Sequence, residues 1–446
     1  MPGPTLITDS DLSGLLKNFY TQYRIKAQNT ITPFLAQLRK AKAGGPRNIR
    51  WGGNGAFWDV VTGRPAGGTF SAGGFFPPDT FAQEKQASTG VARAYVTRQI
   101  DGLVGLGTKS KEVAFDTILR KTAEEITDAS RLLMQGALHG AGQGICAIIG
   151  TVTDSTHIIV AKPYGVTNAG QGSLLLSAGD YIAVLDTTGA TLRGKSNITS
   201  IGTVSATSYN ATLLLTTAIA GMGATDIVVK ATVSDTSYSS TAGQNVINGL
   251  VNMSNRGGSY GTLSGLSAST SPIWDCVAMS AGTDTPDATQ ATESDVWDLI
   301  KRVAGWSGKD ANVNPKEFLL MTTPGVAKNL MESFVGQRRF SSEGFDSNIK
   351  GGYRSIEICG IPCFEDIYCP AGTIYLIHLP SMAWGAAKDW GFVEFEGSGA
   401  WRWIQGRDAF ETTHSYIGNA INLQRNTLGS ISGYTFDTTF YTFVSK

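Results

Sequence analysis

The sequence predicts an α+β protein in which helical segments alternate with strand-rich segments along 446 residues. Residues 108–138 repeat apolar side chains with the period of an amphipathic helix. Residues 145–235 lose that period and are rich in Thr, Ser, Gly and Val, which is typical of strands joined by turns. Helical signals resume from residue 243, and residues 384–446 return to strand-like patterns. The length allows two or three average domains.

The composition is neutral and poor in charge. The chain has 36 basic and 36 acidic residues, and charged residues make up 16% of it, against roughly 25% in an ordinary globular domain. Proteins whose net charge is near zero tend to associate. We therefore expect other subunits to cover much of the surface.

Membrane insertion, secretion and a disulfide framework are all disfavoured. The apolar runs are far shorter than the ~18 residues of a spanning helix. The N-terminus has neither the basic nor the apolar region of a secretory signal. The five cysteines are an odd number and lie mostly in apolar stretches, which indicates reduced, buried thiols in a cytoplasmic product.

Residues 1–45 form the first predicted unit, a basic arm with short helices. Phe34, Leu35 and Leu38 share one side of a helical piece over residues 33–42. Because such an arm cannot bury enough apolar area to fold alone, we expect it to lie on a neighbour. The first fifty residues hold two acidic and eight basic side chains, the basic ones being Lys17, Arg24, Lys26, Arg39, Lys40, Lys42, Arg47 and Arg50.

Residues 46–105 are predicted to form a long hairpin that docks on another subunit. Two extended stretches, residues 47–61 and 91–100, flank a tip rich in Gly, Pro and Phe. A loop of this length without a helix is usually functional, and its exposed aromatic side chains would aggregate unless a partner covered them. The alternative, a disordered loop, fits this aromatic content poorly. The candidate contact residues are Trp58, Arg64, Phe70, Phe75, Phe76, Phe81 and Lys85.

Residues 106–144 contain the clearest helix, and residues 145–240 are predicted to be an inserted β domain. Six short strand-like runs separated by turn clusters favour a small antiparallel barrel or sandwich for the insertion. Glycines end the helix before it. The predicted apolar face of the helix is Phe115, Ile118, Leu119, Thr122, Ile126, Ala129 and Leu133.

Residues 241–383 are predicted to form a mixed unit, and residues 384–446 to add further strands. Thr292 and Asp295 fit a capping box at the start of a helix. The later elements expected in these two units are a strand at 317–321, a helix at 325–334, strands within 355–365 and 372–378, and a long amphipathic stretch over 409–428.

One string matches a nucleotide-binding motif without the surroundings that the chemistry needs. Gly189 to Ser196 fits the phosphate-binding loop letter for letter. That loop must open a helix whose N-terminus faces the phosphates, yet a β-branched, Gly-interrupted segment follows here. A turn in the β domain is the favoured interpretation, and a nucleotide-binding enzyme using Lys195 stays open as an alternative.

A second string matches the nucleophile elbow of hydrolases. Gly257 to Gly261 fits the elbow around Ser259, with His378 or His414 as conceivable partners. An elbow joins a buried strand to a helix, whereas polar residues precede this string. The elbow interpretation is therefore disfavoured in the same way, and a hydrolase using Ser259 stays open as an alternative.

The remaining polar clusters are expected to be structural. Cys359, Cys363 and Cys369, with His378, match no standard zinc spacing, so we expect buried thiols on strands and no metal or cofactor. The carboxylate pairs Glu365–Asp366 and Glu394/Glu396 are expected at solvated strand edges.

The order of these parts resembles the major capsid proteins of tailed bacteriophages, which have the Hong Kong 97-type fold. In that family a basic N-terminal arm precedes an extended hairpin, the E-loop, and then the long spine helix of a peripheral domain. Segments that start at Gly249, Asn314, Ile356 and Trp390 resemble those that build the axial domain and close the peripheral domain. The β insertion is absent from the minimal fold, although several capsid families carry a barrel there.

The resemblance implies a viral structural protein that is not an enzyme. Its subunits would form hexamers and pentamers of an icosahedral shell around double-stranded DNA, assembled in the host cytoplasm and located in the virion. A separate scaffolding protein and a portal are implied partners, and a decoration protein is left open. The side chains that would touch DNA nonspecifically on the inner face are Lys17, Arg24, Lys26, Arg39, Lys40 and Lys42.

Three alternatives stay open beside this interpretation. The basic arm could be a solvated or subunit-docked helix face and make no DNA contact. An encapsulin-type nanocompartment shell would have the same fold but hold an enzyme cargo. A β-rich adhesin is disfavoured by the lack of a signal sequence.

Overall fold

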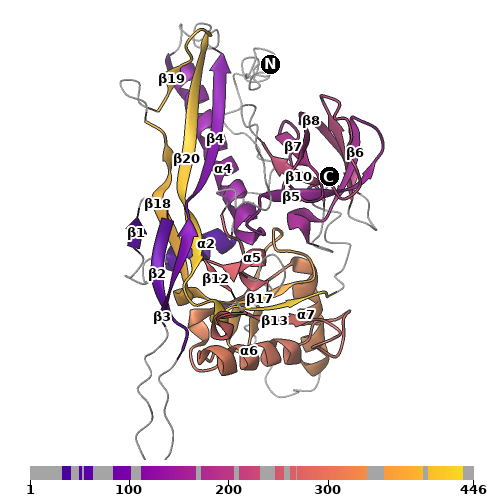
Figure 1. The fold of residues 1–446 in the computed structure, drawn as a ribbon, viewed down its shortest axis with the longest axis vertical. Helices are drawn as coiled ribbons and strands as arrows, with labels where there is room; N and C mark the ends of the chain where they lie inside the picture. The colour runs from indigo at the N-terminus through magenta and orange to yellow at the C-terminus, as the bar shows by residue number, and fades with distance from the viewer. Residues whose placement is uncertain are drawn as a thin grey trace, which may run out of the picture.

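A computed structural model gives the fold of the chain in separate stretches. It describes residues 33–41, 50–52, 55–63, 84–101, 112–166, 172–204, 210–231, 247–255, 262–267, 269–338, 356–394 and 400–434. These stretches form a long antiparallel sheet, a six-stranded mixed sheet, a closed barrel and a short hairpin sheet (Figure 1). The predicted α+β class is confirmed.

The long sheet is built around strand β20 (Ala409–Asn422). On one side β20 pairs with β4 (Ala92–Asp101) over ten residues, and on the other with β18 (Met382–Phe392) and β19 (Arg402–Trp403). Helix α4 (Glu112–His139) lies along this sheet (Figure 1). Met134 of α4 packs with Tyr416 and Ala420 of β20 in one core, which fixes the helix to the sheet.

The buried face of α4 agrees with the prediction at Thr122 and Ile126 and differs from it at Ala129 and Leu133. Ala129 is exposed and Leu133 is only half-buried. The cause is that several buried positions of α4 carry polar side chains, which an apolar periodicity does not reveal. Ser130, for example, donates to the carbonyl of Ile126 and hydrogen-bonds His414 of β20 at 2.8 Å. Phe115, Ile118 and Leu119 of the predicted face are on the part of α4 whose side chains the structure does not describe. Within residues 121–139 the buried residues are Thr122, Ile126, Ser130, Met134, Gln135, Gly136, Leu138 and His139.

The six-stranded sheet lies between two layers of helices. Alternate residues of its central strands point to opposite faces, as the pleat requires. Phe318 and Leu320 pack with helices α6 (Glu293–Ser307) and α7 (Pro324–Arg338), whereas Leu319 and Met321 pack toward α4 and α5 (Leu250–Ser254). The strand order is β13 (Val277–Ser280), β21 (Gly429–Ser432), β17 (Ile374–His378), β14 (Phe318–Thr322), β16 (Ile361–Glu365) and β15 (Ile356–Ile358).

Two details of this sheet bear on the sequence predictions. The capping box is confirmed, since the Thr292 side chain accepts from the N–H of Asp295 and the Asp295 carboxylate accepts from the N–H of Thr292. The C-terminal segment contributes to both sheets. After β20 the chain crosses into the six-stranded sheet, where β21 pairs with β13 and β17.

The region 145–230 forms a closed six-stranded barrel with its own apolar core. The order around the barrel is β10-β5-β6-β9-β8-β7, with every pair antiparallel. Ile149, Ile158 and Val184 are among the fully buried side chains inside it. The strands are β5 (Ile145–Val152), β6 (His157–Ala161), β7 (Tyr181–Leu185), β8 (Leu192–Val204), β9 (Ala211–Leu215) and β10 (Ile227–Lys230).

The hairpin sheet has a different second strand from the predicted one. Strand β2 (Gly55–Val61) pairs with β1 (Arg50–Gly52) and with β3 (Glu84–Gly90), whereas residues 92–101 belong to the long sheet. The sequence EKQASTG of β3 is polar, and only Ala87 and Thr89 in it are buried, so it gives little strand signal. The remaining short elements are α2 (Pro33–Ala41), β11 (Thr262–Leu263), β12 (Leu266–Ser267) and the 3-10 turns η2 (Pro163–Gly165), η4 (Pro272–Trp274), η5 (Pro315–Glu317), η6 (Leu379–Ser381) and η7 (Arg425–Thr427).

Candidate functional site

The phosphate-binding string lies in a β-hairpin of the barrel. Gly189 is in the turn between β7 and β8, and Lys195 is on β8, where it pairs with Ala183. A strand follows the motif where a nucleotide site needs a helix N-terminus. The prediction of a turn in the β domain is confirmed, and the string offers no cradle for phosphate.

The two conceivable histidine partners of a nucleophile elbow are engaged elsewhere, and Ser259 lies outside the described residues. His378 contacts Ser381 Oγ through Nδ1 at 2.6 Å and Glu317 Oε2 through Nε2 at 3.2 Å. Ser381 is buried and only three residues away in the turn η6, so this Ser-His-Glu contact closes a turn and presents no nucleophile to solvent. Burial lowers the pKa of His378 despite the carboxylate of Glu317. His414 is likewise internal and bonded to Ser130.

Four of the five cysteines are buried as expected, but of Cys359, Cys363 and Cys369 only Cys363 lies on a strand. Cys146, Cys276, Cys363 and Cys369 are buried, and Cys359 is half-buried. Burial raises the pKa of Cys276 to about 11 and that of Cys363 to about 12, so these thiols stay protonated near neutral pH. Within the described part of the chain, no three His, Cys, Asp or Glu side chains are arranged to hold a metal ion.

The expectation that Asp366 lies at a solvated strand edge is wrong. Asp366 is buried and its carboxylate lies 2.9 Å from Nε2 of His139. It also accepts a hydrogen bond from Nε2 of Gln135. Since the partners come from α4, more than two hundred residues earlier, no local pattern around Asp366 indicates its burial.

Trp58, predicted as an exposed hairpin contact, lies inside its own chain. It is 4% exposed and packs in a cluster with Leu266, Trp274 and Ile421. The expectation of exposure is wrong because the face of β2 that carries Trp58 is covered by the β12–η4 segment and by β20. Trp58 is therefore not available to a second subunit in this structure.

Lys85 is the other described residue of the predicted hairpin contact. It lies on β3, and its ammonium group donates to Ser271 Oγ at 2.8 Å and to the carbonyl of Thr270 at 3.3 Å. These contacts tie the base of the hairpin to the segment before η4. The remaining members of the predicted set, Arg64, Phe70, Phe75, Phe76 and Phe81, lie outside the described residues.

The basic arm is described only at helix α2. Phe34, Leu35 and Leu38 are buried in the core beside α4, so for this helix the neighbour that covers it is its own chain. Arg39 and Lys40 lie on α2, but the structure describes only the backbone of these two residues. Lys17, Arg24, Lys26 and Lys42 lie outside the described residues altogether.

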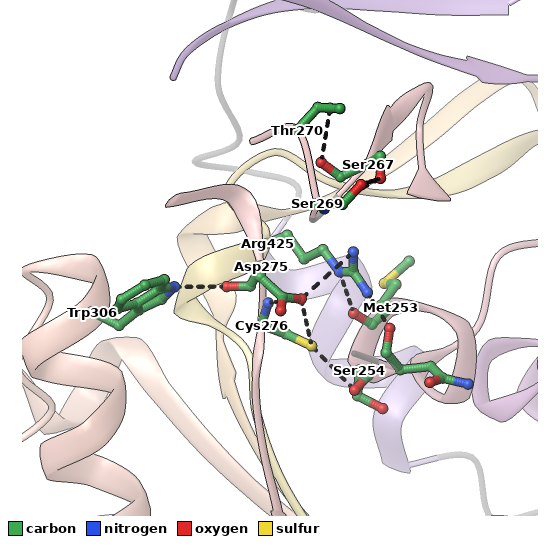
Figure 2. A network of polar contacts seen from close by, with 10 residues as sticks. Met253, Ser254, Ser267, Ser269, Thr270, Asp275, Cys276, Trp306 and Arg425 are labelled. Atoms are coloured by element: carbon green, nitrogen blue, oxygen red, sulfur yellow. Dashed lines mark hydrogen bonds and ion pairs between the residues drawn. The ribbon is translucent and has the colours of Figure 1, made fainter. Parts of the chain in front are cut away.

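A buried arginine joins the two sheets, and the sequence did not reveal it. Arg425 lies between β20 and β21 and is fully buried. Its Nε donates to the carbonyl of Met253 at 2.9 Å, its guanidinium also donates to the carbonyl of Asn255, and Nη1 lies 3.9 Å from Asp275 Oδ1 (Figure 2). Trp306 of α6 donates to the backbone carbonyl of Asp275 at 3.0 Å. One cation thus fixes the end of α5, the start of β13 and the crossover between the sheets.

The exposed surface offers features suited to association with other chains. Strand β4 has β20 on one side, and no described residue pairs with its other edge. Such an edge presents free backbone donors and acceptors to another strand. Tyr95 on β4 and Trp297 and Trp306 on α6 are among the large apolar side chains that are 43–52% exposed. Among the described helices, none is long and apolar enough to cross a membrane.

Comparisons with known proteins identify the fold. No family model matches the chain, and no curated protein matches its sequence. A chain in the capsid asymmetric unit of cyanophage A-1(L) matches with a TM-score of 0.55 and 13% identity, covering 96% of this chain and 99% of that one. Weaker matches are the capsid of a native GTA particle (TM-score 0.43, 8% identity, covering 96% of this chain and 99% of that one) and Gordonia phage Cozz (TM-score 0.42, 13% identity, covering 95% and 93%). The chain has the fold of a phage capsid protein.

Proposed function

We propose that this chain is the major capsid protein of a tailed bacteriophage, with the Hong Kong 97-type arrangement. The observation that carries the proposal is the shared fold with the cyanophage capsid chain over nearly the full length of both. Residues 1–45 are the arm, 46–105 the E-loop, and 106–144 with the strands β18 to β20 of the C-terminal segment the peripheral domain, with α4 as its spine. Residues 241–383 form the axial domain, whose six-stranded sheet also includes β21 from the C-terminal segment. The barrel within 145–240 is an insertion.

The physical features of the surface support self-association. The edge of β4 with which no described residue pairs and the half-exposed tryptophans of α6 are costly on an isolated monomer and useful where copies meet. Zero net charge removes the long-range repulsion between identical chains. We infer hexamers and pentamers that close into an icosahedral shell around double-stranded DNA in the virion, assembled in the host cytoplasm with scaffolding and portal proteins.

The first test is assembly and its dependence on the hairpin tip. Electron microscopy of the expressed chain is expected to show regular shells. Deletion of residues 63–80 should leave monomers or capsomers, because the proposed role of the tip is to lie over an adjacent subunit. A matched control deletes residues 187 and 188, which are exposed in the β7–β8 turn, and shells should persist. Intact shells from the hairpin deletion would contradict this role.

The proposal has one rival with the same fold. A nanocompartment shell would also assemble, but it would hold protein cargo in place of a genome. Nuclease-resistant double-stranded DNA inside particles from infected cells separates the two.

A further inference from the structure

The loop between β16 and β17 is fixed to helix α4 by a buried carboxylate. Asp366 in this loop and Gln135 and His139 of α4 are all buried. One oxygen of Asp366 accepts hydrogen bonds from Nε2 of Gln135 and, at 2.9 Å, from Nε2 of His139. The other oxygen accepts the backbone N–H of Tyr368 at 2.9 Å. Among the described residues, the partners of this carboxylate are therefore placed by α4 or by the loop itself.

The same glutamine holds the N-terminal helix. Oε1 of Gln135 accepts the backbone N–H of Leu35 at 3.1 Å. This N–H belongs to the first turn of α2, where backbone donors have no acceptor within the helix. Phe34 of α2 packs against the ring of His139, with ring centroids 5.5 Å apart. Helix α2 is thus bound to the two side chains of α4 that also bind Asp366.

The same loop holds the barrel. The hydroxyl of Tyr164, in turn η2 of the barrel, donates to the carbonyl of Tyr368 at 2.8 Å. Burial raises the pKa of Tyr164, and the nearby charge of Asp366 raises it further. Tyr164 has a left-handed backbone with φ of 61°, a conformation that persists only where the surroundings enforce it. The barrel also touches α4 itself, because a Cβ at Gly136 would lie 2.7 Å from Cδ2 of Leu175.

We propose that the loop of residues 366–369 couples helix α2 to the barrel, so that loosening either one weakens the docking of the other. Hydrogen bonds run without a gap from the N–H of Leu35 through Gln135, Asp366 and Tyr368 to the hydroxyl of Tyr164. Most of these groups are screened from water, so loss of one member leaves the next without a partner and shifts the loop. Energetic coupling of this kind is reciprocal.

The coupling gives the N-terminal arm a way to influence the barrel on the other side of the loop. Its use in a shell rests on the proposed function. The coupling itself is a property of one chain and does not need assembly.

Hydrogen exchange measured by mass spectrometry on the full unassembled chain tests the coupling. Tyr164→Phe removes only the hydroxyl, and amide exchange in peptides covering residues 33–41 should rise at least about fivefold. Gln135→Leu should raise exchange across residues 157–166 in return. Tyr181→Phe, which removes a hydroxyl from strand β7 of the same barrel, is the matched control and should leave residues 33–41 as in the wild type.

The proposal is overturned if Tyr164→Phe accelerates exchange in the barrel alone. A second measurement uses the stabilities of Gln135→Leu, Tyr164→Phe and the double variant. Coupled sites give a double variant that departs from the sum of the singles, and additive effects would also overturn the proposal. Neither measurement depends on shell formation, so their failure is distinct from failure of the capsid assignment.

Discussion

At the scale of single residues, Arg425 contributes most clearly to holding the two sheets together. Its guanidinium is fully buried and is bound by two backbone carbonyls at the end of α5 and by Asp275. Removing one partner of a buried ionic contact leaves the others without compensation. We predict that Arg425→Met lowers the free energy of unfolding by about 3–5 kcal/mol, measured by urea denaturation.

The matched control is an arginine whose ion pair is partly exposed. Arg302 pairs with Asp284, and the two side chains are 48% and 33% exposed. Solvent screens such a pair, so Arg302→Met should cost no more than about 1 kcal/mol. Equal losses for the two variants would show that burial at Arg425 does not carry the effect.

At the scale of elements, the barrel is a self-contained unit joined to the body at neighbouring points. Ile145 at its start pairs with Val229 near its end, so the two chain ends lie side by side in one ladder. We predict that replacing residues 146–228 by a short Gly-Ser linker leaves the rest of the chain folded. All nine tryptophans lie outside the barrel, so their fluorescence in urea reports on the body alone.

The expected result is a cooperative transition of the body that is kept after excision, together with a folded isolated barrel over residues 145–231 by circular dichroism. A small loss of stability is expected, because the contact between Tyr164 and Tyr368 disappears. An insoluble or non-cooperative body would mean that the barrel is part of the core of the molecule.

The elements that the sequence predicted well are those with local signals. Turn clusters indicated six strands in the inserted domain, and the barrel has six; the pair Thr292 and Asp295 placed the start of α6. The misses arise from tertiary contacts. Strand β3 has a polar sequence, and its pairing with β2, which no local pattern indicates, makes it a strand. Asp366 and Trp58 are buried by segments far away in the sequence, which no window around either residue contains.

At the scale of the whole molecule, zero net charge conceals a strong separation. The first fifty residues carry a net charge of +6, so the remainder carries −6. In the rest of the chain, basic side chains form ion pairs with acidic side chains of the same region, for example Lys301 with Asp310 and Arg302 with Asp284. The excess positive charge therefore sits on the segment proposed to line the inside of the shell, where phosphate is the natural counter-charge.

The basic arm yields the last prediction. Changing Lys17, Arg24 and Lys26 together to Gln should weaken nonspecific binding of double-stranded DNA and lower the slope of log Kobs against log salt by about 3, because each phosphate contact releases about one counterion. Filter binding over a salt series measures this slope. The control changes the exposed Lys309, Lys316 and Lys388 to Gln, which alters net charge equally. Equal slopes for the two triple variants would contradict DNA binding by the arm and would favour contacts between the arm and other subunits.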